Sequence, residues 1–260
     1  MARQALSIVG AGRVGSALCT GLYDAGFKIN TIVSKTRESA SSLAEKYNAA
    51  WRLKPEFDSE TSVIIVAVPD HMLQNVLSGL ECAEDTIVAH TAGSLDLNIF
   101  PDRIKKRGVI YPLQTFTRGR TIRFKGLPFF IEASHRDVAR VLSGLAEKMG
   151  GKVYLTDGEQ RKQLHLAAVF ACNFTNHLLT AGKELAVKAG MEFNILEPLI
   201  KETIEKALEK GPEHSQTGPA VRNDGITIKK QMDLLSFSPE FQDIYRSITK
   251  SIIKYHNSDT

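Results

Sequence analysis

The chain has 260 residues, of which 43% are hydrophobic and 24% charged, and these ordinary globular values exclude intrinsic disorder and fibrous repeats. The formal net charge of +4 comes from basic residues that are spread along the chain, so nucleic-acid binding is not indicated. The apolar runs are far shorter than the roughly 20 residues that span a bilayer, and the N-terminus lacks the pattern of a signal peptide. We therefore expect a cytoplasmic protein without a membrane partner.

Length and cysteine usage bound the architecture. A chain of this size exceeds the usual single domain, so two domains are predicted. Cys19, Cys82 and Cys172 lie far apart and form no C-x-x-C pair. The sequence therefore predicts neither a metal site nor a disulfide.

The chain begins with a strand, a glycine-rich turn and a helix. An apolar run over residues 6–9 is followed by three glycines, and a helical pattern starts directly after them. In such a turn the first glycine bends the chain, the second lets the backbone approach a pyrophosphate, and the third lets the helix pack on its strand. The helix N-terminus then faces the phosphates with free N–H groups. We predict a dinucleotide site made by Gly10, Ala11, Gly12, Arg13, Val14 and Gly15; the alternative is a tight turn without a ligand.

The residues after the second predicted strand (29–33) indicate which dinucleotide is bound. An NAD enzyme places a carboxylate about 20 residues beyond the glycines, where it binds the ribose 2′-hydroxyl. Here the residues are Ser34, Lys35, Thr36 and Arg37, which offer hydroxyl and cationic groups to a 2′-phosphate. The sequence therefore predicts NADP as the cofactor, with a solvated basic turn as the alternative.

The next segments complete a mostly parallel sheet. The continuous apolar run over residues 62–68 is typical of a parallel strand that is covered on both faces. Further strands are expected at 50–53, 86–89, 109–111, 127–131 and 152–155, and helices at 38–47, from Asp70 onward, and at 135–149.

The carboxyl ends of these strands predict where a ligand lies. Ligands of open α/β sheets bind outside those ends, so Val68, Pro69 and residues 90–94, including Thr91, should border the cofactor. Asp70 is expected to cap its helix. His90 is either a structural hydrogen-bonding residue or a catalytic one.

From residue 156 on, the sequence predicts helices only. Residues 156–159 (Thr-Asp-Gly-Glu) have the form of a capping box, and the helical pattern after them continues to about residue 188. Its apolar residues spread beyond one stripe, which indicates cover by a second subunit. Further helices are expected at 195–209, 226–235 and 239–255, with a loop at 211–224.

The predicted fold class is therefore α/β, with a Rossmann-type, mostly parallel sheet followed by an all-helical C-terminal domain. We assign residues 1–156 to dinucleotide binding, and residues 157–260 to substrate binding and dimerisation.

Polar side chains within the long helix are candidates for chemistry. His165, Asn173 and His177 recur at intervals of eight and four residues, which places them on neighbouring parts of one side of an α-helix. A buried polar group without a partner costs on the order of 1–3 kcal/mol, so these groups either bond to nearby backbone or serve a ligand. In the second case His165 is a general acid near neutral pH, and Asn173 orients the substrate.

Two further segments carry polar groups. In the loop at 217–224, Thr217 offers a hydroxyl, Arg222 can hold a carboxylate bidentately, and Asp224 can cap the following helix. The locally basic run is either a solvated surface or an anion gate over the cofactor; it consists of Arg118, Arg120, Arg123 and Lys125.

Five segments carry a resemblance to known proteins: 66–70 (Val-Ala-Val-Pro-Asp), 90–94 (His-Thr-Ala-Gly-Ser), 112–116 (Pro-Leu-Gln-Thr-Phe), 165–173 and 217–224. The N-terminal half resembles pyrroline-5-carboxylate reductases, β-hydroxyacid dehydrogenases and deazaflavin-dependent NADP oxidoreductases. The whole chain is similar to a bacterial family assigned as NADP oxidoreductases, whose C-terminal helical domain has no assigned function. The resemblance implies an NADP-binding domain, a helical domain that forms a homodimer, and an active site between them. We assign Gln114 to substrate binding.

Two departures limit what the resemblance implies about mechanism. Many relatives have His where this chain has Tyr111, and the β-hydroxyacid dehydrogenases have a catalytic Lys on the long helix where this chain offers His165, with Lys162 one turn earlier. The leading hypothesis is an NADP-dependent oxidoreductase that transfers hydride between NADPH and a carbonyl or imine carbon of a small, anionic substrate. The alternatives are an NADP-binding sensor without catalysis and a prephenate-dehydrogenase-like enzyme, against which Tyr111 counts.

Overall fold

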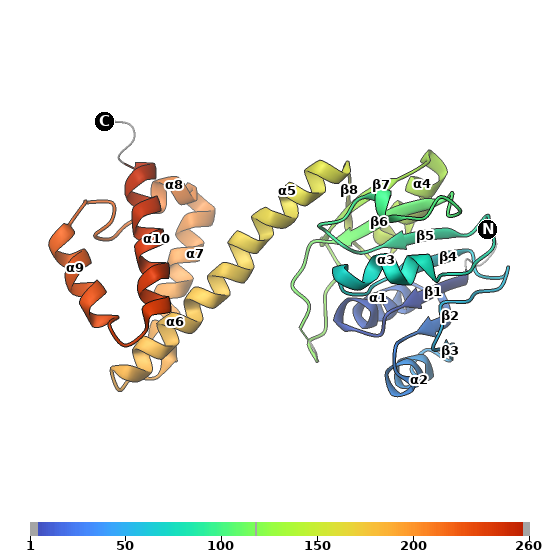
Figure 1. Cartoon of the computed structure of the whole chain (residues 1–260), viewed down its shortest axis with the longest axis horizontal. Helices are drawn as coiled ribbons and strands as arrows, with labels where there is room; N and C mark the ends of the chain where they lie inside the picture. Colours follow the sequence, from blue (N-terminus) through green and yellow to red (C-terminus); the bar gives the residue numbers. More distant parts are fainter. Residues whose placement is uncertain (1–4, 118, 257–260) are drawn as a thin grey trace. The chain divides into compact units, whose positions relative to one another are not determined.

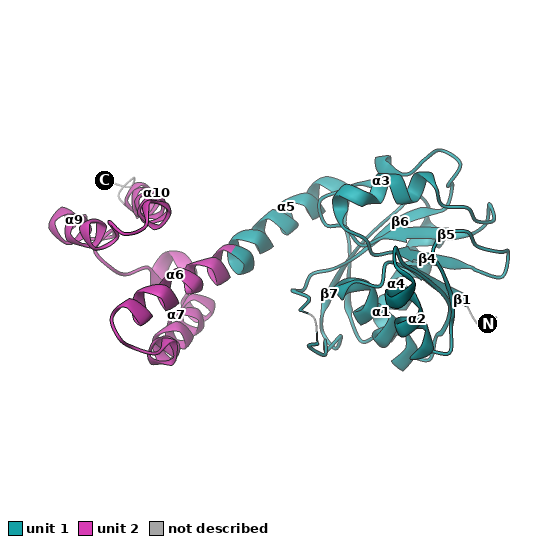
Figure 2. Ribbon diagram, turned by 60° about the horizontal axis from the view of Figure 1, so that its bottom comes forward, with its two compact units in different colours: residues 1–173 teal, residues 174–260 magenta. Residues whose placement is uncertain are grey.

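The computed structural model describes residues 5–117 and 119–256. The chain divides into two compact units, residues 1–173 and 174–260, drawn in teal and magenta in Figure 2. This division falls beyond residue 156 because the first part of the long helix packs with the N-terminal unit. The assignment of domains by role stays a prediction.

The N-terminal unit is built on one eight-stranded sheet with the order β3–β2–β1–β4–β5–β6–β7–β8 (Figure 1). All neighbouring strands are parallel except β6 and β7, which are antiparallel. The strands are β1 (Ala5–Val9), β2 (Lys28–Val33), β3 (Ala50–Arg52), β4 (Val63–Val66), β5 (Ile87–His90), β6 (Arg107–Pro112), β7 (Pro128–Ala133) and β8 (Lys152–Leu155). All eight expected strands are therefore present, with ends that differ by a few residues.

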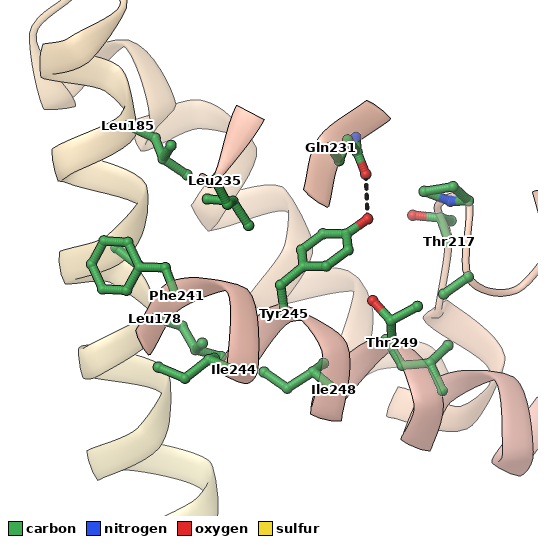
Figure 3. Close-up of a pocket in the computed structure, with 14 residues that line it drawn as sticks. Leu178, Leu185, Thr217, Gln231, Leu235, Phe241, Ile244, Tyr245, Ile248 and Thr249 are labelled. Carbon is green, nitrogen blue, oxygen red and sulfur yellow. Dashed lines mark hydrogen bonds between the residues drawn. The ribbon is translucent and has the colours of Figure 1, made fainter. Parts of the chain in front are cut away.

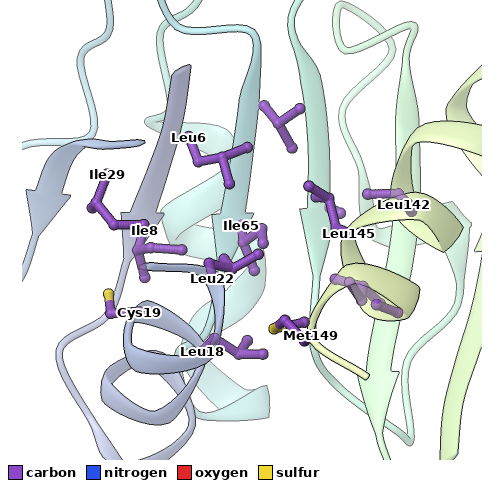
Figure 4. Close-up of a cluster of buried hydrophobic side chains, with 14 of the residues drawn as sticks. Leu6, Ile8, Leu18, Cys19, Leu22, Ile29, Ile65, Leu142, Leu145 and Met149 are labelled. Atoms are coloured by element: carbon purple, nitrogen blue, oxygen red, sulfur yellow. The ribbon is translucent and has the colours of Figure 1, made fainter. Parts of the chain in front are cut away.

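Helices cover both faces of this sheet. They are α1 (Arg13–Asp24), α2 (Arg37–Glu45), α3 (Asp70–Ser78) and α4 (Arg136–Lys148). Buried side chains of α1, α2 and α4 form one core with the strand residues Leu6, Ile8 and Ile65 (Figure 4). Side chains of α3 form a second core with Ile64 and Val66. Successive residues of β4 thus point to opposite faces, and both faces are apolar because both are covered.

The helical segment after β8 begins one residue later than its sequence suggests. α5 (Gly158–Ala168) is capped by Asp157, whose carboxylate accepts the N–H of Gln160 at 2.8 Å. The Gln160 side chain accepts in return from the N–H of Asp157 at 3.3 Å. The capping box exists, but Asp157 and Gln160 form it in place of Thr156 and Glu159, since Asp is at least as good a cap as Thr.

A wide helical turn interrupts the long helix that was expected to be regular. The segment η2 (Val169–Phe174) is π-helical and leads into α6 (Thr175–Lys188). A π-helical turn closes i→i+5 hydrogen bonds instead of i→i+4 bonds, so it changes the angular spacing of the residues on either side. The division between the two units falls within this turn.

The C-terminal unit is all helical, as predicted. Besides α6 it contains α7 (Glu197–Lys210), α8 (Pro212–Ser215), α9 (Gly225–Leu234), α10 (Pro239–His256) and the short 3₁₀ turn η3 (Phe193–Leu196). The expected loop at 211–224 thus contains one short helix. Among the described residues of the C-terminal unit, only Ala220 and Leu235 are buried hydrophobic side chains. No helix in the described part of the chain is long and apolar enough to cross a membrane.

Candidate cofactor and catalytic site

The glycine turn has the geometry that the sequence predicts. Gly10 has φ +109°, and a Cβ there would lie 2.3 Å from the carbonyl oxygen of Ala67. A Cβ at Gly15 would lie 1.8 Å from the carbonyl oxygen of Gly10. A Cβ at Gly12 would meet no atom within 4 Å, and no side chain caps the N-terminus of α1. The turn therefore leaves open space and free N–H groups where a pyrophosphate would bind, which fits a dinucleotide.

The residues after β2 lie at the same carboxyl edge, and two of them have structural partners. Thr36 caps α2: its hydroxyl accepts the N–H of Ser39 at 3.3 Å. The guanidinium of Arg37 lies over the ring of Trp51, 5.3 Å from its centroid. Lys35 is exposed and Ser34 is half-buried. The indole of Trp51 thus fixes the position of the Arg37 guanidinium at the edge of the sheet.

His90 is a structural residue, which decides between the two roles that the sequence left open. It ends β5 without any exposed surface, and its Nδ1 accepts the N–H of Ala92 at 3.2 Å. The ring stacks on Phe100 at 5.4 Å. Burial lowers the pKa of His90 from 6.5 to about 3, so the imidazole is neutral near pH 7 and has no exposed surface to offer a substrate.

Tyr111 and His165 form a polar pair at the carboxyl edge of the sheet. Tyr111 of β6 and His165 of α5 are joined by a hydrogen bond of 2.9 Å between Oη and Nδ1, and their rings meet edge to face. Gly93, which follows β5, lies against both rings: a Cβ there would be 2.7 Å from His165 Nδ1 and 2.8 Å from Tyr111 Cζ. Three segments far apart in the sequence thus converge at one point.

The surroundings of Tyr111 keep its hydroxyl protonated. Burial, and next the negative charge of Asp70, raise the pKa of Tyr111 to about 12. Asp70 begins α3 and accepts a hydrogen bond from the hydroxyl of Ser94. The expectation that Asp70 caps α3 is wrong, because the helix starts at Asp70 itself and its carboxylate is bound to Ser94.

Charged groups one turn before His165 fix α5 on the N-terminal unit. Arg161 is fully buried and bonds to the carboxylate of Glu132 and to the carbonyl oxygen of Leu95. Lys162 pairs with Asp96 at 2.8 Å. Because residues three and four positions apart lie on one side of a helix, Arg161 and Lys162 hold the side of α5 that carries His165 against the sheet.

The remaining predicted residues are distributed over both units. Val68, Pro69 and Thr91 lie at the ends of β4 and β5, and the N–H of Thr91 donates to Val66 at 3.2 Å. Gln114 is exposed, and its side-chain oxygen accepts from the N–H of Thr115 at 2.8 Å.

Asn173 is exposed and ends the N-terminal unit inside the π-helical turn, whereas His177 belongs to the C-terminal unit. The α-helical spacing that related them to His165 has to be corrected for this turn. Their functional roles stay predictions.

In the C-terminal unit, Thr217 lines an apolar cavity of about 260 Å³ (Figure 3). Leucine and isoleucine side chains surround it, and at its wall Tyr245 donates a hydrogen bond to Gln231 at 2.5 Å. Arg222 is exposed. Asp224 caps α9 by accepting the N–H of Thr227 at 3.0 Å, as predicted.

The described residues of the basic run after β6 lie at the protein surface. Arg120, Arg123 and Lys125 are exposed, and Arg118 lies outside the described residues. Within residues 5–117 and 119–256, no group of three or more His, Cys, Asp and Glu side chains could hold a metal ion.

Sequence reasoning missed one member of the site, because Tyr111 was noted only as a departure from relatives. Gly93 and Ser94 were predicted to border the cofactor only as part of the segment 90–94. The same topological signal applies to Tyr111, which stands near the carboxyl end of its strand, where ligands of such sheets bind. The partner on α5 could not be found in this way, because only packing brings His165 to that edge.

The sheet order, the glycine turn and the helices on both faces define the class: a Rossmann-like domain followed by a helical unit. Residues 1–115 match the family model of a Rossmann-like domain, and residues 127–252 match that of a domain of unknown function, DUF2520. A protein of Bacteroides fragilis that is named a "putative NADP oxidoreductase" is 38% identical, with 96% of this chain and 98% of that chain covered and a TM-score of 0.87. This chain belongs to the family that joins a Rossmann-like domain to DUF2520.

Two other solved structures share the fold. Protein TM1727 of Thermotoga maritima is 25% identical, with 98% of this chain and 99% of that chain covered and a TM-score of 0.71. A 1-pyrroline-5-carboxylate reductase of Streptococcus pyogenes is 13% identical, with 97% and 98% covered and a TM-score of 0.61, which shows likeness of fold alone. No curated protein matches the chain.

Proposed function

We propose that the protein is an NADP-dependent oxidoreductase acting on a carbonyl or imine carbon of a small, anionic substrate. When bound, the nicotinamide cofactor supplies or accepts the hydride. The name carried by the Bacteroides fragilis relative supports this class of reaction. The observation that carries the proposal is the joint presence of an open, uncapped glycine turn and the Tyr111–His165 pair at the carboxyl edge of one sheet.

The residues of this chain have distinct tasks in the proposal. The turn from Gly10 to Gly15 binds the pyrophosphate, and Ser34 with Arg37 binds the 2′-phosphate. Val68, Pro69 and Thr91 border the nicotinamide ribose. His165 donates the proton to the substrate oxygen or nitrogen as hydride arrives, or accepts it in the reverse direction. Gln114 and Asn173 of the N-terminal unit are proposed to contact the substrate, and the substrate-binding roles of Thr217 and Arg222 stay predictions.

A thermal-shift titration with NADPH and NADH in parallel tests cofactor binding. A ligand at 100 times its dissociation constant stabilises the native state by about 2.7 kcal/mol. We expect NADPH to raise the melting temperature at far lower concentration than NADH. Arg37→Ala should weaken NADPH binding about tenfold and leave NADH binding unchanged, whereas Lys28→Ala, at the opposite end of β2, should change neither. Equal or tighter binding of NADH would refute the NADP assignment.

Turnover decides between an enzyme and a cofactor sensor. The native protein is assayed for NADPH oxidation with a panel of 2-oxo acids and cyclic imines, and His165→Ala should lower kcat on the active compound by about 100-fold or more. Full turnover by His165→Ala would remove the proposed proton donor. Tight NADPH binding without turnover of any panel member would favour the sensor.

We also propose that the protein is a homodimer through its helical unit. The helical unit has 87 residues (174–260), and among its described residues only Ala220 and Leu235 are buried hydrophobic side chains. It therefore lacks the core that a stable domain of this size needs. Large exposed hydrophobic side chains of this unit include Leu199, Leu208, Ile226 and Leu234. A second copy of the chain would cover them. The cytoplasmic location stays a prediction.

A further inference from the structure

The hydrogen bond between Tyr111 and His165 involves one particular ring nitrogen. Tyr111 Oη lies 2.9 Å from Nδ1 of His165. The Tyr111 ring is held by stacking on Phe130 at 6.3 Å. The backbone of Gly93 lies against the same two rings, since a Cβ there would be 2.7 Å from Nδ1. The imidazole is thus restrained on its Nδ1 side, and α5 is fixed one turn earlier by the buried Arg161.

A hydroxyl can satisfy Nδ1 in every protonation state of a histidine. It donates to Nδ1 when the neutral ring carries its proton on Nε2, and it accepts from Nδ1–H when the ring is an imidazolium. It also accepts when the neutral ring carries its proton on Nδ1. A carboxylate could only accept, and a phenylalanine could do neither. The Tyr111 hydroxyl can therefore keep the ring of His165 in one orientation while the ring gains and loses a proton.

We propose that Tyr111 is a positioning residue that holds Nδ1 of His165 and leaves Nε2 as the atom that exchanges a proton with the substrate. This rests on the proposed oxidoreductase function. In the reductive direction the Nε2–H bond of the imidazolium breaks and its electron pair stays on Nε2. The proton forms a new bond to the substrate oxygen or nitrogen. Nδ1–H remains bonded to Tyr111 Oη, and solvent returns a proton to Nε2 for the next turnover.

The electrostatics of the pair agree with a hydroxyl that stays protonated. Burial and the nearby Asp70 carboxylate raise the pKa of Tyr111 to about 12, although the positive charge of Arg161 acts in the opposite direction. A phenolate is therefore disfavoured throughout the neutral range. The hydroxyl remains available both as donor and as acceptor, and the proton delivered to substrate comes from His165.

A nuclear magnetic resonance experiment tests the positioning without any substrate. The full chain is labelled with ¹⁵N-histidine, and the ring signals of His165 are assigned with His165→Gln. In the neutral ring of the native protein we expect the proton on Nδ1, where the Tyr111 hydroxyl accepts it, because this is the tautomer that remains when Nε2 has given up its proton. In Tyr111→Phe the Nδ1 signal should move to the position of a nitrogen without a hydrogen bond, while exposed His214 stays unchanged. An identical Nδ1 signal in both proteins would overturn the proposal.

A kinetic cycle tests whether Tyr111 acts through His165. The assay uses NADPH with the member of the 2-oxo acid and cyclic imine panel that the native protein reduces. Tyr111→Phe should lower kcat by about tenfold to 100-fold, a part of the roughly 10²–10⁴-fold that a general acid supplies, and leave KM for NADPH unchanged. In a His165→Ala background the same change should have no further effect. If the two substitutions together lower kcat by the product of their separate effects, Tyr111 acts independently of His165 and the proposal is overturned.

Folding and function are separated by two controls. Each variant must keep its cooperative melting transition and its NADPH-dependent rise in melting temperature. If the native protein reduces no panel member, the proposed function fails, while the Nδ1 signal still decides the positioning role. If turnover is found but Tyr111→Phe retains full kcat, the positioning role fails and the proposed function stands.

Discussion

At the scale of single residues, Gly93 shows how a small side chain defines the site. Its backbone follows β5 and lies between two rings that come from β6 and α5. The atoms that an added Cβ would meet belong to the side chains of His165 and Tyr111. An added methyl group would therefore displace those rings and leave the surrounding sheet in place.

We predict that Gly93→Ala separates Tyr111 from His165 and lowers turnover at least as much as Tyr111→Phe does. NADPH binding should be retained, because the glycine turn at residues 10–15 is untouched. Turnover and the NADPH-dependent melting shift are measured side by side, with Gly144→Ala as the control, because a Cβ at Gly144 would meet no atom within 4 Å. Retained turnover in Gly93→Ala would contradict the geometry.

His90 makes a prediction about acid stability. Its pKa is about 3 in the folded chain against an ordinary value of 6.5, so the unfolded state binds a proton that the native state excludes. The stabilising contribution is complete above pH 6.5 and is lost as pH falls toward 3. Stability should decrease by about 1.4 kcal/mol per pH unit below 6.5, or about 2 kcal/mol by pH 5.

The measurement is urea unfolding at pH 7, 6 and 5. In His90→Asn the amide oxygen can still accept the Ala92 N–H but does not titrate. This variant should be less stable at pH 7, because it loses the ring that stacks on Phe100, and its stability should depend less on pH. If the native protein and His90→Asn lose stability equally as pH falls, groups other than His90 cause the loss.

At the scale of elements, α5 is the helix whose placement brings His165 to Tyr111. Its first turn is capped by Asp157, and its next turn carries the fully buried Arg161. Only 16% of the Glu132 side chain is exposed. Removing the guanidinium would leave this carboxylate without its partner in a poorly solvated place.

We predict that Arg161→Met destabilises the N-terminal unit by about 3–5 kcal/mol. The neighbouring Lys162→Met should cost much less, because the Lys162 side chain is 35% exposed and water can replace its partners. Urea unfolding of both variants, with hydrogen exchange in α5, measures the difference. Similar losses for the two variants would contradict the assigned role of burial.

At the scale of the whole molecule, the two units differ in how well they cover their apolar residues. The N-terminal unit has two extensive cores, one on each face of the sheet. In the C-terminal unit, Leu208 is 81% exposed and Ile226 is 73% exposed. Apolar side chains this exposed over one helical unit indicate a protein surface that covers them.

We predict a sedimentation mass of twice the monomer and a melting temperature that rises with protein concentration. Leu208→Lys combined with Ile226→Lys should shift the equilibrium toward monomer by at least about tenfold, because lysine disfavours burial in an interface. The control is Leu53→Lys, an exposed leucine of the N-terminal unit. A monomer at all concentrations would refute the homodimer.

The sequence by itself determined the fold, because the fold depends on local patterns. Apolar runs predict the strands, the turn at residues 10–15 needs glycine, and periodicity and caps predict the helices. The family assignment followed from the same segments and is confirmed. Where local signals compete, as Thr156 and Asp157 do for one cap, only the structure decides.

Tertiary structure alone decided which polar groups meet. Tyr111 and His165 are separated by 54 residues, yet packing brings their side chains to 2.9 Å. His90 and His165 look alike in sequence, but His90 lies in the core and His165 is half-buried at the edge of the sheet. Burial and side-chain proximity depend on how elements far apart in the chain pack together, and no local pattern encodes them.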